Sequence, residues 1–452
     1  MAAEPQAIAG GTPADLTAAE AAKRIEQGQL SSVELVESCI ERIRQVDGKV
    51  EAWAFFDEEL ARTQARAADE LRRSGKGAGP LCGIPVGVKD IFDTSDYPTE
   101  NGNRVQKGRT PRKDAAAVAM LRAAGAVIMG KTVTTECAYY HPGKTRNPHN
   151  PEHTPGGSSS GSAAAVAAGM VPVALGSQTN GSVIRPAAFC GVYGFKPTHG
   201  LIPRTGILAL SRALDHVGFF SRSLEDLALL AEVLVGWDEG DPDTQPRARV
   251  PFREVALEEP PVEPVLAFIK TPHWDKADTD MKEAFGELRE TLGERVEEVD
   301  LFPSATDAWE WHRIIMETEM TANLRHLWDK GEKKLSQKLR DLIARGRETK
   351  AFDYLRALRM IPALNASFDE MFEQRYDAII TPPAPGTAPK GIKSTGDPSF
   401  CSLWTLVGLP AITLPLMQGE NGMPLGVQLV GRRGFDARLL RTARWLEQRV
   451  QS

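Results

Sequence analysis

The sequence predicts an α/β protein in which helices cover a β-sheet. From residue 80 onward, short β-rich runs alternate with helical segments, as expected when helices join successive strands. The chain has 452 residues, of which 42% are hydrophobic and 25% are charged, so it can bury a large core. This composition excludes a disordered chain, a coiled coil and a small disulfide-stabilised protein.

The strands are expected where short apolar runs stand between turn and helix signals. In chain order these runs are 84–89, 126–129, 171–175, 191–195, 216–220, 265–269, 296–301, 378–380, 411–414 and 425–430. The helices are expected where cap residues precede apolar positions at helical spacing. They follow the capping box at 31–34 and lie at 115–124, at 162–168, from 223, near 279–292 and from about 437.

These patterns divide the chain into four segments. They are an N-terminal helical region (1–79), an α/β core (80–240), a variable and mainly helical region (241–375) and the C-terminal part of the same core (376–452). Residues 237–262 are rich in Pro, Asp and Glu, which is typical of a surface excursion. The helical stretch 305–375 contains Trp309, Trp311 and Trp328, so it could overhang a site as an apolar lid.

The charge balance argues against a nucleic-acid binder. With 54 basic and 60 acidic residues, the net charge is -6, whereas nucleic-acid-binding domains carry a basic excess. The 5 cysteines are scattered without a CxxC pair, which favours free thiols in a reducing compartment. The N-terminal stretch lacks the apolar region of a signal peptide, and the longest apolar run, 163–175, is shorter than the ~20 residues that cross a bilayer. We therefore expect a soluble cytoplasmic protein without membrane contact.

Residues 125–132 literally match the phosphate-loop pattern GxxxxGK[ST], in which backbone N–H groups surround phosphates. The middle residues are Ala, Val, Ile and Met, and the Val-Ile pair favours a buried strand. Such a strand would occupy the place of the loop. We therefore expect a core strand here and no nucleotide site.

A second glycine-rich stretch, 155–169, is a Gly/Ser loop that runs into a helix of small residues and ends at Gly169. The N–H groups at the start of this helix could hold an anion. No lysine follows Gly161, so phosphate-loop chemistry is not supported. Taken alone, the stretch is more typical of a tight structural turn than of a catalytic loop.

Three further stretches carry residues that indicate chemistry. Lys89 ends the expected buried strand 84–89, an unusual place because lysine is rarely buried without a partner. Ser182 follows a glycine at a strand exit, within the stretch 178–186 that reads Gln-Thr-Asn-Gly-Ser-Val-Ile-Arg-Pro. The third stretch, 190–198, reads Cys-Gly-Val-Tyr-Gly-Phe-Lys-Pro-Thr.

Together with the Gly/Ser loop, these stretches resemble the amidase signature family in their order and spacing. The resemblance extends from about residue 80 to 235 and resumes from Tyr376 to the end of the chain. It implies one large mixed β-sheet covered by helices on both faces, with an inserted helical layer, and it makes 80–240 the catalytic core. It also implies an amidohydrolase that needs no cofactor.

The resemblance implies a triad of Lys89 as the base, Ser158 as the bridging serine and Ser182 as the nucleophile, with a cis peptide between Gly157 and Ser158. This chemistry is coherent, because a serine hydroxyl needs a base and serine–lysine arrangements are known variants of the histidine-based triad. Lys89 must be neutral to act as a base, and burial at a strand end lowers the pKa of an amine. Ser158 would relay the proton from Ser182 to Lys89.

The resemblance also implies an oxyanion hole made by backbone N–H groups that lead to the nucleophile, those of Thr179, Asn180, Gly181 and Ser182. Relatives usually carry Gly-Gly before the nucleophile, whereas this chain has Asn180 and Gly181. The Asn180 side chain would narrow or polarise the acyl side of the pocket. Ser177 and Gln178 stand where many relatives have Thr and Asp.

Two further sets of residues have a functional and a structural interpretation. Arg185 either binds a substrate carboxylate, as an arginine at this position does in some family members that act on small acidic amides, or forms a structural ion pair behind the loop. Arg185 and Asn180 are the expected substrate contacts. His149 and His153 have i,i+4 spacing, but prolines surround them, so we expect no metal site.

We therefore expect an amidohydrolase that cleaves a small aliphatic or aryl amide, or a carbamate, through an acyl-enzyme on Ser182. Aryl acylamidase and urethanase activities fall within this prediction. The alternative is the glutaminase subunit of a tRNA-dependent amidotransferase, against which the acidic balance and the poorly matching region 240–375 argue. The expected partner is a small-molecule amide or carbamate, with no nucleic acid, no membrane and a homodimer left open.

Overall fold

The computed structural model describes residues 11–75 and 78–451, which contain one 11-stranded sheet. Its strands are β1 (Trp53–Phe56), β2 (Pro85–Lys89), β3 (Val127–Thr132), β4 (Val173–Gln178), β5 (Tyr193–Lys196), β6 (His216–Ser221), β7 (Leu266–Phe268), β8 (Val296–Glu298), β9 (Ala378–Thr381), β10 (Ala411–Gln418) and β11 (Pro424–Val430). Across the sheet their order is β1-β3-β2-β4-β6-β5-β10-β11-β9-β7-β8.

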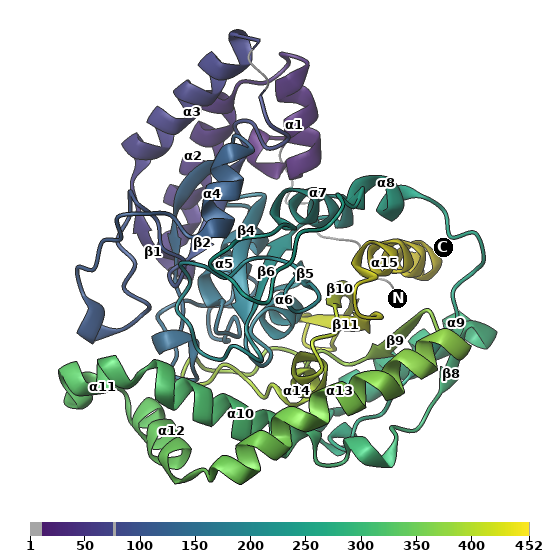
Figure 1. Cartoon of the computed structure of the whole chain (residues 1–452). Helices are drawn as coiled ribbons and strands as arrows, with labels where there is room; N and C mark the ends of the chain where they lie inside the picture. Colours follow the sequence, from purple (N-terminus) through teal and green to yellow (C-terminus); the bar gives the residue numbers. More distant parts are fainter. Residues whose placement is uncertain (1–10, 76–77, 452) are drawn as a thin grey trace.

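The sheet is mixed. β2 pairs in parallel with β3 and β4, and β7 pairs in parallel with β8 and β9. The other neighbouring strands are antiparallel. Helices pack on both sides of the sheet (Figure 1), and the predicted α/β fold is confirmed.

The α-helices of the described residues are α1 (Ala18–Glu26), α2 (Ser32–Val50), α3 (Glu58–Arg73), α4 (Ala116–Ala123), α5 (Ser160–Ala167), α6 (Ile184–Cys190), α7 (Leu224–Leu234), α8 (Phe252–Leu257), α9 (Thr279–Leu292), α10 (Ala308–Asn323), α11 (Arg325–Gly331), α12 (Gln337–Glu348), α13 (Ala351–Gln374), α14 (Ser399–Leu406) and α15 (Asp436–Gln451). We call α10–α13 the helical layer. In Figure 1 these green helices lie together along one side of the molecule, and α10 contacts α12, α13 and α14.

The cap signals act as the sequence predicts. The Ser31 hydroxyl accepts a hydrogen bond from the Glu34 N–H, and the Glu34 carboxylate accepts one from the Ser31 N–H, so the capping box opens α2. The Ser223 hydroxyl accepts from the Asp226 N–H and opens α7 in the same way. Each cap satisfies N–H groups that the first turn of a helix leaves without a partner.

Each expected strand overlaps an observed one, but the strand β1 and the helices α6, α8 and α14 were not expected. β1 is a short strand from the N-terminal region that pairs with β3 at the sheet edge. α8 lies within the expected surface excursion 237–262, where it contacts α7 and α15. The sheet also draws strands from all four predicted segments, whose boundaries therefore remain a prediction.

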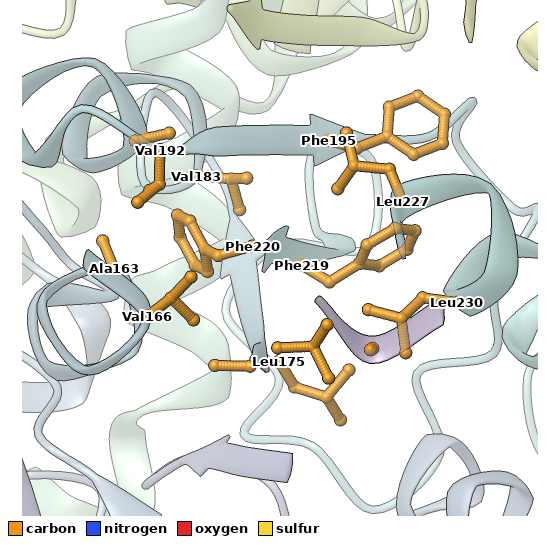
Figure 2. Packing of buried hydrophobic residues seen from close by; sticks show 14 of the residues in the cluster. Ala163, Val166, Leu175, Val183, Val192, Phe195, Phe219, Phe220, Leu227 and Leu230 are labelled. Carbon is orange, nitrogen blue, oxygen red and sulfur yellow. The ribbon is translucent and has the colours of Figure 1, made fainter. Parts of the chain in front are cut away.

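Buried apolar side chains form two main clusters. The larger one, here the sheet cluster, packs helices against the sheet, and Figure 2 shows Leu175, Phe219 and Phe220 within it. The other, here the layer cluster, joins the helical layer to α14 and to the β9–β11 part of the sheet. Val183 belongs to the sheet cluster and the next residue, Ile184, to the layer cluster. The segment that follows Ser182 therefore lies at the boundary between the two clusters.

Two general expectations can be compared with the structure. All the cysteines are buried free thiols. In the part of the chain that the structure describes, no helix has both the length and the apolar character needed to cross a bilayer.

Candidate active site

Lys89 is the last residue of β2, a strand that lies between β3 and β4 inside the sheet. Its side chain is fully buried, and its Nζ lies 2.7 Å from the Ser158 Oγ and 2.8 Å from the Ser177 Oγ. Burial holds the pKa of Lys89 well below its ordinary value, and the Asp215 carboxylate opposes this only in part. Burial therefore makes the neutral form of this amine more accessible than it is for an exposed lysine.

Ser158 lies in the turn before α5, and the peptide between Gly157 and Ser158 is cis, as the resemblance implies. Small residues allow this turn to pack against other backbone segments. A Cβ at Gly161 would lie 2.2 Å from the Ala52 carbonyl oxygen, so only glycine fits there. The Arg185 guanidinium donates to the Gly157 carbonyl over 2.6 Å and holds the turn from the other side.

Ser182 follows β4 and precedes α6, and the residue is 8% exposed. Its hydroxyl makes no hydrogen bond within residues 11–75 and 78–451. Lys89 and Ser158 are therefore joined directly in this structure, whereas Ser182 is placed by its loop without a hydrogen bond to Ser158. A hydroxyl without other partners is available to a bound carbonyl compound.

The loop 178–182, here called the nucleophile loop because it carries the expected nucleophile Ser182, is held by hydrogen bonds at its middle residues. The Thr179 hydroxyl donates to the Asp215 carboxylate over 2.6 Å. The Asn180 amide donates to the Tyr140 hydroxyl over 2.9 Å and accepts from the Ser402 hydroxyl over 2.7 Å. The Asn180 side chain is thus fixed at both ends, which explains how the loop accommodates it in place of glycine.

Gln178 closes the base of the same loop. Its side-chain Oε1 accepts from the N–H groups of Val183 and Ile184, and its side-chain Nε2 donates to the Thr405 hydroxyl over 3.0 Å. These bonds satisfy N–H groups at the start of α6, where no side chain of the N-cap residue does so. The residue that departs from the usual Asp therefore has a structural role.

Arg185 is buried, and its guanidinium donates to the Gly157 carbonyl and to the carbonyl and hydroxyl of Thr395. It forms no ion pair among the described residues, and its Nη1 has no hydrogen-bond partner there. The ion pair of the structural interpretation is not formed within the described chain, and hydrogen bonds to neutral oxygens take its place. Its role as a substrate contact stays a prediction.

Asp215 is a partly buried carboxylate whose charge acts on Lys89. It accepts from the Thr179 hydroxyl and from the N–H groups of Leu210 and Ser211, and burial raises its pKa to about 6. A cavity of about 210 Å³ is lined by Asp215, Ser177 and Thr179 among others, but not by Lys89, Ser158 or Ser182. The cavity therefore borders the lysine through Ser177.

Sequence reasoning did not find Ser177, Asp215, Tyr140 or His312 as members of the site. Ser177 was noted only as a departure from the usual residue, and its hydroxyl is a direct partner of Lys89. His312 comes from α10 and lies 2.9 Å from the Thr179 carbonyl oxygen through its Nε2. A residue so distant in sequence carries no local signal that could have revealed this contact.

The residues of the phosphate-loop match and of the histidine pair make structural contacts. Lys131, from the phosphate-loop match, is a buried residue of β3 that pairs with Asp90 at 3.3 Å. The rings of His149 and His153 bond to the carbonyl oxygens of Cys190 and Ala388. Over the described residues, no group of His, Cys, Asp and Glu side chains could hold a metal ion.

Comparison with known proteins agrees with this geometry. Residues 34–440 match the family described as Amidase. The chain belongs to the amidase family. It is 34% identical to the A subunit of the glutamyl-tRNA(Gln) amidotransferase of Lachnospira eligens, over 92% of this chain and 94% of that protein. It is 36% identical to the protein of the same name from Symbiobacterium thermophilum, over 96% of both chains.

Solved structures of the amidase fold are also similar. The peptide amidase of Stenotrophomonas maltophilia has a TM-score of 0.83 and 28% identity, over 96% of this chain and 97% of that chain. A structure described as a vestigial protein complex that reveals the origins of an s-triazine catabolic enzyme has a TM-score of 0.89 and 29% identity, over 96% and 98%. The prediction of an amidase-family hydrolase that acts on C–N bonds is confirmed.

The expectation about partners is wrong. It allowed a small-molecule amide or carbamate and excluded nucleic acid, largely from the acidic charge balance. The curated relatives are named as subunits, and their name includes a tRNA. Net charge describes the whole surface, whereas a subunit of a complex needs only a local surface for its partners.

Proposed function

We propose that the protein hydrolyses a carboxamide through an acyl-enzyme on Ser182, with Ser158 and Lys89 as the proton path. The observation that supports this most directly is the buried Lys89 amine, whose Nζ lies 2.7 Å from the Ser158 hydroxyl. A neutral amine in this place can accept a proton, which a serine nucleophile requires.

The reaction begins when the Ser182 Oγ attacks the amide carbonyl carbon. The Ser182 proton passes to Ser158, whose own proton passes to the Lys89 Nζ. Return of a proton by the same path to the amide nitrogen breaks the C–N bond and releases ammonia or an amine. Water then attacks the acyl-enzyme with the same base, which releases the acid and restores the Ser182 hydroxyl.

The developing negative charge needs hydrogen-bond donors that are already in place. The backbone N–H groups from Thr179 to Ser182 are the candidates, because they lie in the loop that carries the nucleophile. The buried side-chain contacts of this loop support a fixed geometry. Such donors need no reorganisation during the reaction.

For the substrate, we favour the side-chain amide of glutamine, with the protein acting as the ammonia-producing subunit of a tRNA-dependent amidotransferase. The support is the similarity to glutamyl-tRNA(Gln) amidotransferase subunits over nearly the full length of both chains. This choice replaces the independent small-amide hydrolase that the sequence favoured.

A second candidate is hydrolysis of other amides, including aryl amides and carbamates, by the chain alone. It is supported by the similarity to a peptide amidase and to 6-aminohexanoate cyclic dimer hydrolase. The aromatic Tyr140 beside Asn180 would suit a substrate larger than the glutamine side chain.

The two candidates are separated by assaying the purified chain on glutamine, an anilide, an aliphatic amide and a carbamate. We expect glutamine to have the highest kcat/KM. A higher value for the anilide or the carbamate would favour the second candidate. Ser182→Ala should abolish turnover of every substrate, whereas alanine at the exposed Ser394 should not. Turnover that survives Ser182→Ala would contradict Ser182 as the nucleophile.

A further inference from the structure

The nucleophile loop has its carbonyl groups tied to donors outside it. The Thr179 carbonyl accepts from the His312 Nε2 over 2.9 Å, and the Asn180 carbonyl accepts from the Thr405 hydroxyl over 2.5 Å. The Gly181 carbonyl accepts from the Arg185 N–H over 3.0 Å. Three consecutive peptide groups are therefore anchored through their oxygens.

An anchored carbonyl also fixes an N–H group. The C=O of one residue and the N–H of the next belong to the same rigid plane, and in a trans peptide they point in opposite directions. The described chain has a cis peptide only between Gly157 and Ser158. The bond from His312 to the Thr179 carbonyl therefore sets the direction of the Asn180 N–H, which is one of the proposed oxyanion donors.

The His312 side chain is suited to hold this direction. It is 2% exposed, and its acceptor is a carbonyl oxygen, so the Nε2 must carry the hydrogen. Burial lowers the pKa of His312 to about 4, so the ring stays neutral at ordinary pH. Neighbouring residues of α10, among them Ile315 and Met316, are buried in the layer cluster and limit the movement of the helix.

We propose that His312 is a positioning residue that aims the Asn180 N–H at the oxyanion. The inference rests on the proposed role of Ser182 and its loop. It assigns the helical layer a part in the chemistry, because α10 supplies the donor. The layer is then more than a lid over the substrate.

The test compares His312→Met, which removes the donor, with His312→Gln, whose amide can still donate to the Thr179 carbonyl. The matched control is His326→Met, in the same layer but bonded only to the Asn323 carbonyl among the described residues. Loss of a whole oxyanion donor costs about 10²–10³ in kcat, so a misdirected donor in His312→Met should cost about 10- to 100-fold. KM should change by less than about threefold, since a bond used only in the transition state does not affect substrate binding.

A second readout separates positioning from a purely structural role. A boronic acid analogue of the substrate adds to the Ser182 Oγ and forms a tetrahedral anion, so its affinity reports on the oxyanion hole. In His312→Met its affinity should fall by the same factor as kcat/KM, and His312→Gln should restore both. A fall in melting temperature with unchanged kcat and unchanged analogue affinity would overturn the proposal.

If His312→Met does not fold, His312→Gln is compared with His312→Asn, whose shorter amide does not reach the carbonyl. Equal kcat values in these two variants would also overturn the proposal. Failure of the proposed function has a different signature, namely turnover that persists in Ser182→Ala. An inactive Ser182→Ala together with a fully active His312→Met would refute the role of His312 alone.

Discussion

The turn around Ser158 and the helical layer are built from opposite kinds of side chain. In the turn, Gly and Ser residues lead into the Ala residues of α5. Backbone segments lie in direct contact there, since no room remains for a side chain at Gly161. In the layer, large apolar side chains such as Leu342 are buried between helices. The layer also carries ion pairs, among them Glu317 with Arg313 at 2.6 Å and with Arg345 at 2.7 Å.

The two regions have different roles, one in bringing polar groups close together and the other in burying apolar surface. Small residues let hydroxyl groups, an amine and backbone N–H groups approach within hydrogen-bond distance, but they contribute little apolar burial. Large residues contribute that burial, at about 25 cal/mol per Å² of apolar surface. The expected reactive groups therefore lie where backbone segments approach closely, and the layer stabilises the fold around them.

The largest effect should distinguish two buried lysines in neighbouring strands, Lys89 and Lys131. Lys89→Met removes the base, so kcat should fall by at least about 10³-fold while the protein stays folded. Lys131→Met leaves Asp90 buried without its cation and should cost about 3–5 kcal/mol of stability, with the kcat of the folded enzyme retained. The measurements are steady-state kinetics and urea unfolding. Substantial turnover by Lys89→Met would contradict the assignment of Lys89 as the base.

The pH dependence should also follow Lys89. Burial lowers its folded pKa below the ordinary value of 10.5, so the amine loses its catalytic neutral form as the pH falls. We expect kcat/KM to decrease about tenfold per unit below that pKa and to level off above it. The free energy of unfolding should also decrease as the pH falls between the folded and unfolded pKa values of Lys89. In that range the unfolded chain binds more protons than the folded one. An optimum near pH 5 would contradict this account.

The smallest effect on activity should come from the packing of the layer. Leu342→Ala empties a fully buried position in α12 and should cost about 2–5 kcal/mol of unfolding free energy. Its kcat should stay close to that of the wild type, because Leu342 packs within the layer cluster and its apolar side chain makes no hydrogen bond to the nucleophile loop. A large fall in kcat at full folding would show that the layer acts on the site through more than His312.

Much of the fold could be predicted because its strands are short apolar runs between clear turn signals. β1 was missed since Trp53–Phe56 is short and stands between two long helices. α8 was missed because its surroundings are rich in Pro and Glu, whereas its place is set by contacts with α7 and α15. Both elements depend on tertiary partners, which outweigh local propensity.

The candidate site also contains residues that local motifs reveal and contacts that only the tertiary structure reveals. Lys89, Ser158 and Ser182 could be proposed as site residues because they stand in motifs of characteristic residues and spacing. The contacts of His312 and Thr405 could not be predicted, because their acceptors are backbone carbonyl groups, which every residue carries. The Asn180 side chain was expected near the substrate, and the structure shows it bonded to Tyr140 and Ser402.

The division of Val183 and Ile184 between the two clusters has a consequence for engineering. Exchanging the helices of the layer for those of another amidase would alter one wall of the turn that follows the nucleophile. A successful graft must therefore reproduce the surface beneath Ile184 and a donor at position 312, whatever new specificity it brings. Given the proposed role of His312, a change in the layer that alters substrate range would also alter catalytic rate, so the two would have to be optimised together.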